Sequence, residues 1–329
     1  MTHSRLSILI ATKGRIDELE RLLEGIRTCA GRDLIDHEVL IANNAPDGEC
    51  ARAVENLVRL YSKREPHRWF HVREPIPGKS GALNKLIPIS RGDILAFLDD
   101  DVEVTSSWLQ ATYEFFTGSD FDVMQGSIQI PPAFAADKSF LKLLNRYRTI
   151  CYYQRPSSEV REIRSLNAAN MALRRSTLKK TGLFDERIGP GQSGTSMDVE
   201  FGKRLIRAGW RIGYEPSSIV YHNVDWSRLT ESYFRYRHEM QGRSRLIYKG
   251  SSLPKILADL LHAVVTLGIF RLLSLFNLMN NERKTYRAKG RYFHYRAMLW
   301  EKIRGLCRFT TPRMGVGLPS RPRHRPQLP

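Results

Sequence analysis

Short apolar runs alternate with amphipathic stretches through the first hundred residues of the chain. Their length and branched side chains predict four buried strands, at 6–10, 39–42, 69–72 and 94–98. Between the runs, apolar side chains recur at helical spacing and predict three helices, near 19–26, 54–61 and 82–89. This alternation predicts an α/β fold with a mainly parallel sheet covered on both faces. Such sheets bind ligands beyond the carboxyl ends of their strands.

The pattern is less regular after residue 104. A helix is predicted at 108–116, with Thr105 as its cap, and further helices at 139–153 and 198–208. Strands are predicted at 123–130, 167–173, 211–214 and 219–222. The glycine-rich segment 189–194 is predicted to be a flexible loop. The second half therefore adds strands and helices without the strict alternation of the first.

Length and composition are those of a chain with a large core. It has 329 residues, of which 42% are hydrophobic, so we expect one large or two smaller domains. The four cysteines are scattered without the spacing of a metal site or a disulfide framework, which favours a reducing compartment. The opening run Leu6 to Ala11 is shorter than the apolar core of a signal peptide, so a cytoplasmic location is expected.

Basic residues are concentrated toward the C-terminus. The net charge is +18, and from Asn223 onward 21 Lys and Arg stand against 6 Asp and Glu, a balance of +15. Such a segment suits nucleic-acid phosphates or anionic membrane headgroups, and a solvated basic helix face is the plainer alternative. Within it, Leu257 to Met279 is long enough to cross a bilayer but contains Asp259, His262 and Arg271, which favours an interfacial or core helix. The tail from 311 is predicted to be disordered.

Three consecutive carboxylates follow the most apolar predicted strand. Asp99, Asp100 and Asp101 would repel one another, and a divalent cation such as Mg²⁺ or Mn²⁺ is a natural reason to tolerate them; a helix cap or a solvated turn is the alternative. A second candidate is the turn 77–84, where two glycines, Lys79 and the start of a helix suit phosphate or ribose oxygens. Because the spacing is not that of a P-loop, an ordinary strand-to-helix turn stays open.

Two further candidates lie at the ends of elements predicted in the second half. Asp198 opens a helix, where it would serve as a general base toward a hydroxyl or as part of a capping box with Thr195. His222 ends a strand, where it would be a nitrogen ligand of the same cation or a structural histidine. The residue types alone leave both choices open.

In this order along the chain, these segments resemble the family 2 glycosyltransferases with a GT-A fold, over roughly residues 5–245. The segment 8–15 is similar to the family's first strand and nucleotide-contacting turn, and 40–47 to its second strand. The turn 78–84 is similar to the donor-side turn, and Phe97-Leu98-Asp99-Asp100-Asp101 to the DxD segment. The last two matches are 197–210, similar to the acceptor-side segment, and 241–244, similar to a segment that closes over the donor.

The resemblance implies a role for each matching residue. Asp198 would be the catalytic base, and Asp101 and His222 would bind Mn²⁺ or Mg²⁺ bridging a nucleotide diphosphate. Asn43 stands where the family has an aspartate that contacts the base, and Met197 where it has a glutamate. Contacts with the nucleotide-sugar donor would come from Ala11, Thr12, Arg15, Asn43, Asp47, Lys79, Asn84, Asp99, Asp100 and Arg243.

The implied activity is an inverting transfer of a sugar from a nucleotide-diphosphate sugar to a hydroxyl of a saccharide or lipid-linked acceptor, in surface polysaccharide or glycolipid synthesis. The alternatives are a nucleotidyltransferase and a catalytically inactive glycosyltransferase-like module; no nucleic-acid-binding motif occurs in the basic segment. We expect a GT-A domain at 1–245, a basic helical extension at 246–310 and a disordered tail at 311–329. The extension is expected to attach the protein peripherally to the inner face of an anionic cell membrane.

Overall fold

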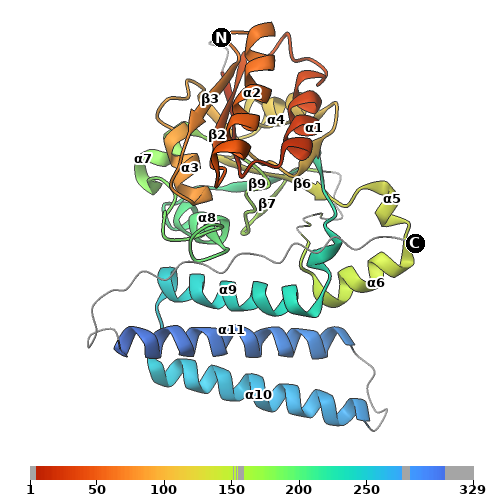
Figure 1. Ribbon diagram of the computed structural model, residues 1–329, viewed down its shortest axis with the longest axis vertical. Helices are drawn as coiled ribbons and strands as arrows, with labels where there is room; N and C mark the ends of the chain where they lie inside the picture. The colour runs from red at the N-terminus through yellow and green to blue at the C-terminus, as the bar shows by residue number, and fades with distance from the viewer. Residues whose placement is uncertain (1–4, 151, 153, 155–158, 276–281, 308–329) are drawn as a thin grey trace.

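The structure is a computed structural model that describes residues 5–150, 152, 154, 159–275 and 282–307 (Figure 1). Its strands are β1 (Leu6–Thr12), β2 (His37–Asn43), β3 (Trp69–Arg73), β4 (Ile94–Asp99), β5 (Val102–Val104), β6 (Val123–Gln129), β7 (Arg161–Ile163), β8 (Asn170–Arg174) and β9 (Ile212–His222). Its α-helices are α1 (Ile16–Arg27), α2 (Gly48–Arg64), α3 (Lys79–Leu86), α4 (Trp108–Gly118), α5 (Pro132–Ala135), α6 (Lys138–Tyr147), α7 (Leu178–Thr181), α8 (Met197–Arg207), α9 (Glu231–Lys249), α10 (Leu253–Leu275) and α11 (Glu282–Cys307). Two short 3-10 helices are η1 (Arg175–Thr177) and η2 (Trp226–Arg228). The tail expected from residue 311 lies outside the described residues.

The strands form one sheet in the order β3-β2-β1-β4-β8-β6-β9-β5, with β7 paired to β9. The first four strands along this order are parallel, as the alternation predicted. β8 runs antiparallel to both β4 and β6. A parallel connection needs a crossover over a face of the sheet. Between β6 and β8, α5 lies beside the sheet and α6 below it (Figure 1). The expected mainly parallel α/β fold is confirmed; β8 interrupts the run of parallel strands after β4, and β6 and β9 are again parallel.

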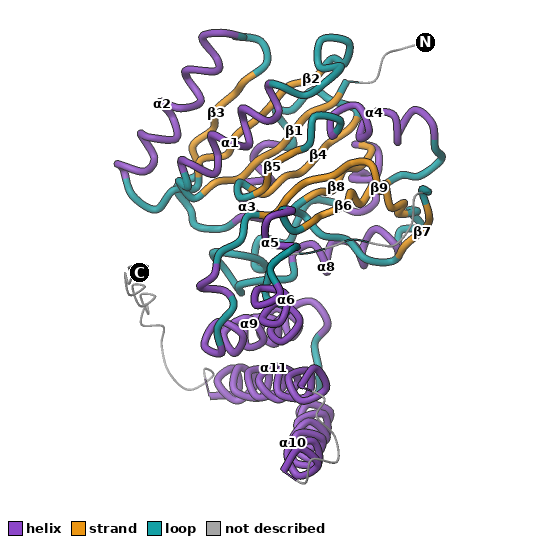
Figure 2. Tube along the Cα trace, turned by 90° about the vertical axis from the view of Figure 1, so that its right-hand side faces the viewer, coloured by secondary structure: helices purple, strands orange, loops and turns teal. Residues whose placement is uncertain are grey.

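Helices cover both faces of this sheet (Figure 2). Along β1, Leu6, Ile8 and Ile10 pack with α1, α2 and α4, while Leu9 and Ala11 pack with α3 and α8. Side chains of a strand point alternately to opposite faces, so β1 contributes to two apolar clusters and all of it is buried. Polar chemistry is therefore left to the ends of the strands.

One long strand, β9, replaces the two strands predicted at 211–214 and 219–222. Its register with β6 shifts after Gly126, so the strand bulges there without ending. The end of β9 pairs with β5, in which Val102 lies opposite His222. β5 has three residues, too few to give a sequence pattern. This pairing brings His222 beside the aspartates that precede β5.

A buried amide joins three elements behind the strand ends. Asn170, on β8, is 1% exposed. It donates from Nδ2 to the carbonyl oxygens of Ser127 at 3.0 Å and Ser218 at 2.8 Å, and its Oδ1 accepts from Nε1 of Trp108 at 3.0 Å. A Cβ on Gly126 would overlap this amide, so glycine leaves room for it. Asn170 thus ties α4 and β6 to β9.

The structure also corrects two expectations about helix caps. Thr105 does not cap α4; its Oγ1 donates to the carbonyl oxygen of Ile219 at 3.2 Å, because Thr105 follows β5 and lies beside β9. The capping box of Thr195 with Asp198 is not formed either. Ser196, which precedes α8, is left-handed with φ of 71° and makes no side-chain cap. Asp198 instead accepts a hydrogen bond through Oδ1 from the N–H of Val199, in the first turn of α8, at 2.8 Å.

Helices α9, α11 and α10 stack below the α/β body (Figure 1). α9 packs on α11, and α11 packs on α10. Gly242 of α9 lies so close to α11 that a Cβ there would overlap the carbonyl oxygen of His294. The boundary expected at residue 245 falls inside α9, which continues to Lys249. The division of the chain into three segments stays a prediction.

One face of α10 is apolar and exposed. Ile256 and Ala263, on the opposite face, are fully buried. Within the described residues, Leu253–Leu273 is the one segment long and apolar enough to cross a membrane, and 11% of its most apolar window is buried. The exposed face, called the α10 stripe below, has side chains at spacings of three and four that are 46–65% accessible: Leu257, Leu261, Val264, Val265, Ile269 and Leu272.

Candidate active site

The ends of β1 and β4 bring several predicted site residues together. Ala11 lies opposite Asp99 in the sheet. Thr12 donates from Oγ1 to Oδ2 of Asp100 at 2.7 Å, and Asp99 forms an ion pair with Lys79 at the start of α3. Neighbouring carboxylates thus have partners on different elements, which offsets their mutual repulsion.

Asp101 is surrounded by cationic and imidazole groups. Its Oδ2 contacts Nη1 of Arg15 and lies 3.1 Å from Nη2 of Arg228, while its Oδ1 lies 3.6 Å from Nε2 of His222. Burial alone would raise the pKa of Asp101, but the guanidinium groups of Arg15 and Arg228 outweigh it and hold that pKa well below its usual range. Arg15 also lies 3.3 Å from Oδ1 of Asp100. Asp101 is therefore ionised, and its two oxygens face different kinds of partner.

Asp101 and His222 fit a divalent cation. His222 is 2% exposed, and burial lowers its pKa, so the imidazole is neutral. Its Nδ1 lies 2.9 Å from the carbonyl oxygen of Asn223, which places the proton on Nδ1 and leaves the Nε2 lone pair for a ligand. In the described ranges, no three Asp, Glu, His or Cys side chains gather as a complete metal site. The protein would supply two ligands, and phosphate oxygens and water the others.

The glycine turn before α3 is packed against the segment 189–194. Gly78 has φ of 152°, and a Cβ on Gly191 would lie 2.8 Å from its nitrogen. The N–H of Lys79 donates to the carbonyl oxygen of Pro190 at 3.0 Å. The segment predicted to be a flexible loop is thus hydrogen-bonded to the turn, and this N–H is not free for a phosphate. The ammonium group of Lys79 remains directed to Asp99.

Asp198 lies in the first turn of α8, within electrostatic range of Lys79 and Asp99. Burial raises the pKa of Asp198 above its usual range, and the hydrogen bond from the N–H of Val199 and the positive charge of Lys79 partly oppose that rise. The residue nevertheless stays partly accessible to solvent. Met197 beside it is 4% exposed, with its sulfur 3.6 Å from Oγ of Ser80. The position at which the family has a glutamate therefore belongs to the core here.

Four other candidates have contacts outside the aspartate cluster. Asn43 donates from Nδ2 to a backbone carbonyl oxygen of α2 at 2.8 Å, and Asp47 caps the same helix. Asn84 is hydrogen-bonded to the loop before α8 through both its Nδ2 and its Oδ1. Arg243 forms an ion pair with Glu301 of α11 at 3.1 Å. Their donor contacts stay predictions.

Arg228 is a site residue that the sequence did not identify. It ends η2, and besides Asp101 it lies 3.4 Å from Asp225. Burial lowers its pKa, but Asp101 outweighs this and raises it, so the guanidinium group stays charged. No motif or periodicity marks this arginine; its partner is brought to it only by the pairing of β5 with β9.

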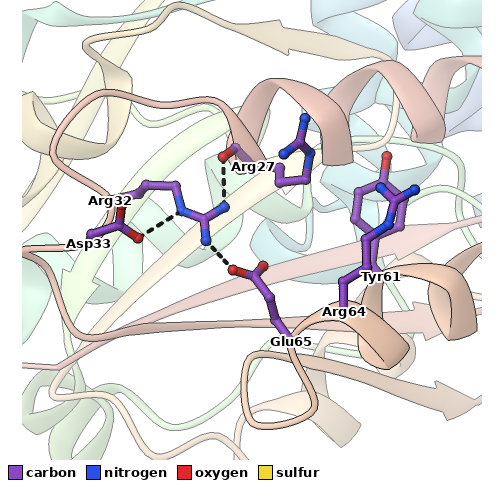
Figure 3. Close-up of a pocket in the computed structure, with 6 residues that line it drawn as sticks. All are labelled: Arg27, Arg32, Asp33, Tyr61, Arg64 and Glu65. Carbon is purple, nitrogen blue, oxygen red and sulfur yellow. Dashed lines mark hydrogen bonds and ion pairs between the residues drawn. The ribbon is translucent and has the colours of Figure 1, made fainter.

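A surface cavity of about 360 Å³ lies at the opposite ends of the strands (Figure 3). Its residues come from the C-terminal ends of α1 and α2 and the segments that lead into β2 and β3. Arg32 donates to the carbonyl oxygen of Arg27 at 2.7 Å and pairs with Glu65. This cavity is separate from the aspartate cluster. It is lined by Arg27, Arg32, Asp33, Tyr61, Arg64 and Glu65.

The fold is that of the GT-A glycosyltransferases. Mannosyltransferase PcManGT from Pyrobaculum calidifontis, solved in complex with GDP-Man and Mn²⁺, superposes with a TM-score of 0.59 at 16% identity. The superposition covers 92% of this chain and 89% of that one. The expected GT-A fold is thereby confirmed.

The sequence profile of Glycosyl transferase family 2 matches residues 7–182, more than half of the chain, and the protein belongs to this family. The pre-mycofactocin glycosyltransferase of Mycobacterium tuberculosis is 28% identical over 229 residues, 68% of this chain and 43% of that protein. Succinoglycan biosynthesis protein ExoM of Rhizobium meliloti is 24% identical over 226 residues, 68% of this chain and 69% of that protein. The chain thus spans less than half the length of the first of these relatives.

Proposed function

We propose that this glycosyltransferase inverts configuration, moving a sugar from a nucleotide-diphosphate sugar to an acceptor hydroxyl with Asp198 as the general base. The observation that carries the proposal is the setting of Asp198, a partly accessible carboxylate of raised pKa near the Lys79–Asp99 ion pair. A carboxylate of raised pKa takes up a proton more readily. An inverting transfer needs such a base and no covalent bond between sugar and protein.

In the proposed reaction, a carboxylate oxygen of Asp198 removes the proton of the acceptor hydroxyl as its oxygen attacks the anomeric carbon. The bond from that carbon to the diphosphate oxygen breaks on the opposite face, so the configuration inverts. The ammonium group of Lys79 interacts with Asp99 and Asp198 and would offset charge on the departing diphosphate. Mn²⁺ or Mg²⁺, when bound at Asp101 and His222, supplies Lewis-acid stabilisation of the same charge.

Donor binding is proposed at the ends of β1 and β4. Asp99 would accept a hydrogen bond from a ribose hydroxyl, and Arg15 would contact the diphosphate. Thr12 orients Asp100 by the hydrogen bond between them, and Ala11 lets the nucleotide approach the end of β1. The remaining donor candidates, Asn43, Asp47, Asn84 and Arg243, are assigned by the family resemblance and need testing by substitution.

The test measures nucleotide release and sugar transfer with UDP-, GDP- and dTDP-sugars, with and without Mn²⁺ or Mg²⁺. We expect metal-dependent release of one nucleotide diphosphate. Asp198→Asn should lower the rate about 10²- to 10⁴-fold, a barrier increase of about 3–5 kcal/mol. Asp101→Asn should abolish the metal-dependent release of the nucleotide diphosphate. Asp185→Asn, in a surface ion pair with Arg187, is the matched control and should leave the rate unchanged.

Other outcomes would favour other functions. Donor binding without turnover across a broad acceptor set would indicate an inactive module. Transfer of a nucleotidyl group to a sugar phosphate, with release of pyrophosphate, would indicate a nucleotidyltransferase. A product that keeps the configuration of the donor sugar would refute the inverting reaction, and a wild-type rate in Asp198→Asn would refute the assignment of the base.

We further propose that the helical extension attaches the protein to the inner face of an anionic cell membrane. α10 is the layer farthest from the sheet in both views (Figures 1 and 2), and the α10 stripe faces outward from α11. Lys255 and Arg271 stand near the two ends of this stripe, and the chain from Asn223 onward carries a balance of +15. Apolar insertion and attraction to anionic headgroups would act together, bringing the enzyme to a lipid-linked acceptor.

Sedimentation with vesicles tests this attachment. The wild type should be retained by phosphatidylglycerol vesicles at low salt and less by phosphatidylcholine vesicles. Leu261→Glu, in the α10 stripe, should release it. The matched control is Leu60→Glu on α2, which is 57% exposed against 65% for Leu261 and should bind like the wild type. Failure of the wild type to sediment with the anionic vesicles at low salt would refute the attachment.

A further inference from the structure

Two guanidinium groups converge on one oxygen of the carboxylate assigned to the metal. Nη1 of Arg15 and Nη2 of Arg228 both contact Oδ2 of Asp101, while Oδ1 of Asp101 faces His222. Arg15 follows β1 and Arg228 ends η2, so the arrangement is assembled from distant parts of the chain. The side chain of Arg228 is 17% exposed and that of Asp101 is 9% exposed. The contact is therefore shielded from much of the solvent.

We propose that Arg228, together with Arg15, makes binding of the divalent cation depend on the nucleotide diphosphate. Both arginines hold Asp101 in the donor-free protein, and both bind diphosphate oxygens when donor and cation enter together. Arg228 is thereby a donor-binding residue and a positioning residue for Asp101. The inference rests on the proposed function, which supplies the diphosphate and the cation.

The charges at the site carry this inference. A cation held by Oδ1 of Asp101 and by His222 would stand close to two positive side chains, Arg15 and Arg228. At a partly buried site such like charges repel strongly. With a diphosphate bound, the net interaction of the cation with its surroundings becomes attractive, because the diphosphate oxygens attract both the cation and the planar guanidinium groups. Each ligand must then raise the affinity for the other by the same factor.

The neighbours of Arg228 allow it to change partner. Its Nε lies 3.4 Å from Oδ2 of Asp225, so it keeps one carboxylate if it leaves Asp101. Asp101 in turn keeps its proximity to His222 and has the entering cation as its new partner. Neither charge would be left buried without a partner, which is the costly outcome when such pairs separate.

The experiment measures Mn²⁺ binding with and without a nucleotide diphosphate, by the electron paramagnetic resonance of free Mn²⁺. UDP, GDP and dTDP are tried on the wild type, and the one that binds is used throughout. In the wild type, we expect it to raise the affinity for Mn²⁺ about tenfold or more. In Arg228→Gln, Mn²⁺ alone should bind about 10- to 100-fold more tightly, and the diphosphate with Mn²⁺ should bind more weakly by a similar factor.

Two further variants test whether the positive charge of the arginine is what matters and provide for a variant that does not fold. Arg228→Lys keeps the positive charge, so it should keep weak binding of Mn²⁺ alone while losing part of the diphosphate affinity. Arg15→Gln should change both affinities in the same directions as Arg228→Gln, which keeps the test open if one variant does not fold. The matched control is Arg211→Gln, at the other end of β9, where Arg211 pairs with Glu162 at 3.2 Å; it should bind like the wild type.

In Arg228→Gln, tighter binding of Mn²⁺ alone together with weaker binding of the diphosphate distinguishes this role from a structural one. Loss of a merely structural arginine would weaken binding of Mn²⁺ alone as well as binding of the diphosphate. Unchanged or weaker binding of Mn²⁺ alone in Arg228→Gln, in a variant of wild-type melting temperature, would overturn the inference and leave the proposed function intact. A wild type that binds none of the nucleotide diphosphates with Mn²⁺ would overturn both.

Discussion

Removal of the Asn170 amide should destabilise the part of the sheet that carries the active site. Asn170→Ala takes two donors and one acceptor from a position that is 1% exposed. The carbonyl oxygens of Ser127 and Ser218 each lose a donor, and Nε1 of Trp108 loses its acceptor. These three groups belong to β6, β9 and α4, so the substitution weakens the contacts among the elements that hold the end of β9 in place.

The expected magnitude follows from these contacts. Each lost hydrogen bond to a carbonyl oxygen costs about 1 kcal/mol, and an indole N–H left without an acceptor in the core costs about 1–3 kcal/mol. The free energy of unfolding should therefore fall by about 3–5 kcal/mol. A loss of this size is a large share of the stability of a typical domain, about 5–15 kcal/mol.

Urea denaturation followed by circular dichroism and tryptophan fluorescence measures the change. Asn170→Asp keeps the shape of the side chain but turns two donors toward carbonyl oxygens into acceptors, so it should cost at least as much as alanine. Gln110→Ala removes an exposed amide of α4 that donates to Glu114 at 2.7 Å, and should change stability by less than about 0.5 kcal/mol. A loss below about 1 kcal/mol in Asn170→Ala would refute the reasoning.

Three more predictions concern other parts of the molecule. Burial would raise the pKa of Glu38, but hydrogen bonds from Arg91 outweigh burial and lower that pKa. The stability that the Glu38 carboxylate adds is therefore complete above the unfolded value of 4.5 and is lost as the pH falls through the lower folded value. In denaturation experiments, Glu38→Gln should differ most from wild type near neutral pH and progressively less below about 4.5. Gly242→Ala should lower the melting temperature, at a cost of about 1–3 kcal/mol, because its Cβ would overlap α11. Gly268→Ala has open space around it and should stabilise α10 by about 0.5–1 kcal/mol. Equal effects of the two substitutions would contradict the close packing of α9 on α11. Since burial raises the pKa of Asp198, kcat/KM should fall with decreasing pH at values above the usual range of an aspartate, and a pH profile that stays flat down to that range would argue against Asp198 as the base.

Much of the fold could be read from local patterns. The first four strands and their helices follow from runs of apolar residues at periods of two and 3.6, because a segment buried on both faces must be apolar along its length. The order of strands beyond β4 could not be read in this way. β5 is three residues long, and the direction of β8 depends on where the chain returns after α6.

The candidate site likewise contains residues that were predictable from the sequence and residues that were not. Asp99, Asp100, Asp101 and Lys79 were predictable, since each follows a strand or opens a helix in a segment that resembles the family. Arg228 was not, because its place depends on the pairing between β5 and β9. Asn84 lies in a matching motif, and the structure adds that its side chain is hydrogen-bonded to the loop before α8, while its contact with the donor stays a prediction.

By itself, the sequence predicted an α/β fold with a carboxylate cluster at a strand end and a basic helical extension, and its motifs carried the resemblance to the family 2 glycosyltransferases. Those properties depend on neighbouring residues, on the period of apolar positions and on charge, all of which are local or additive along the chain. The tertiary structure alone decided that Arg15 and Arg228 share Asp101, that Met197 joins the core and that the α10 stripe faces outward. These contacts depend on strand register and on how distant helices pack, which leave no local mark in the sequence.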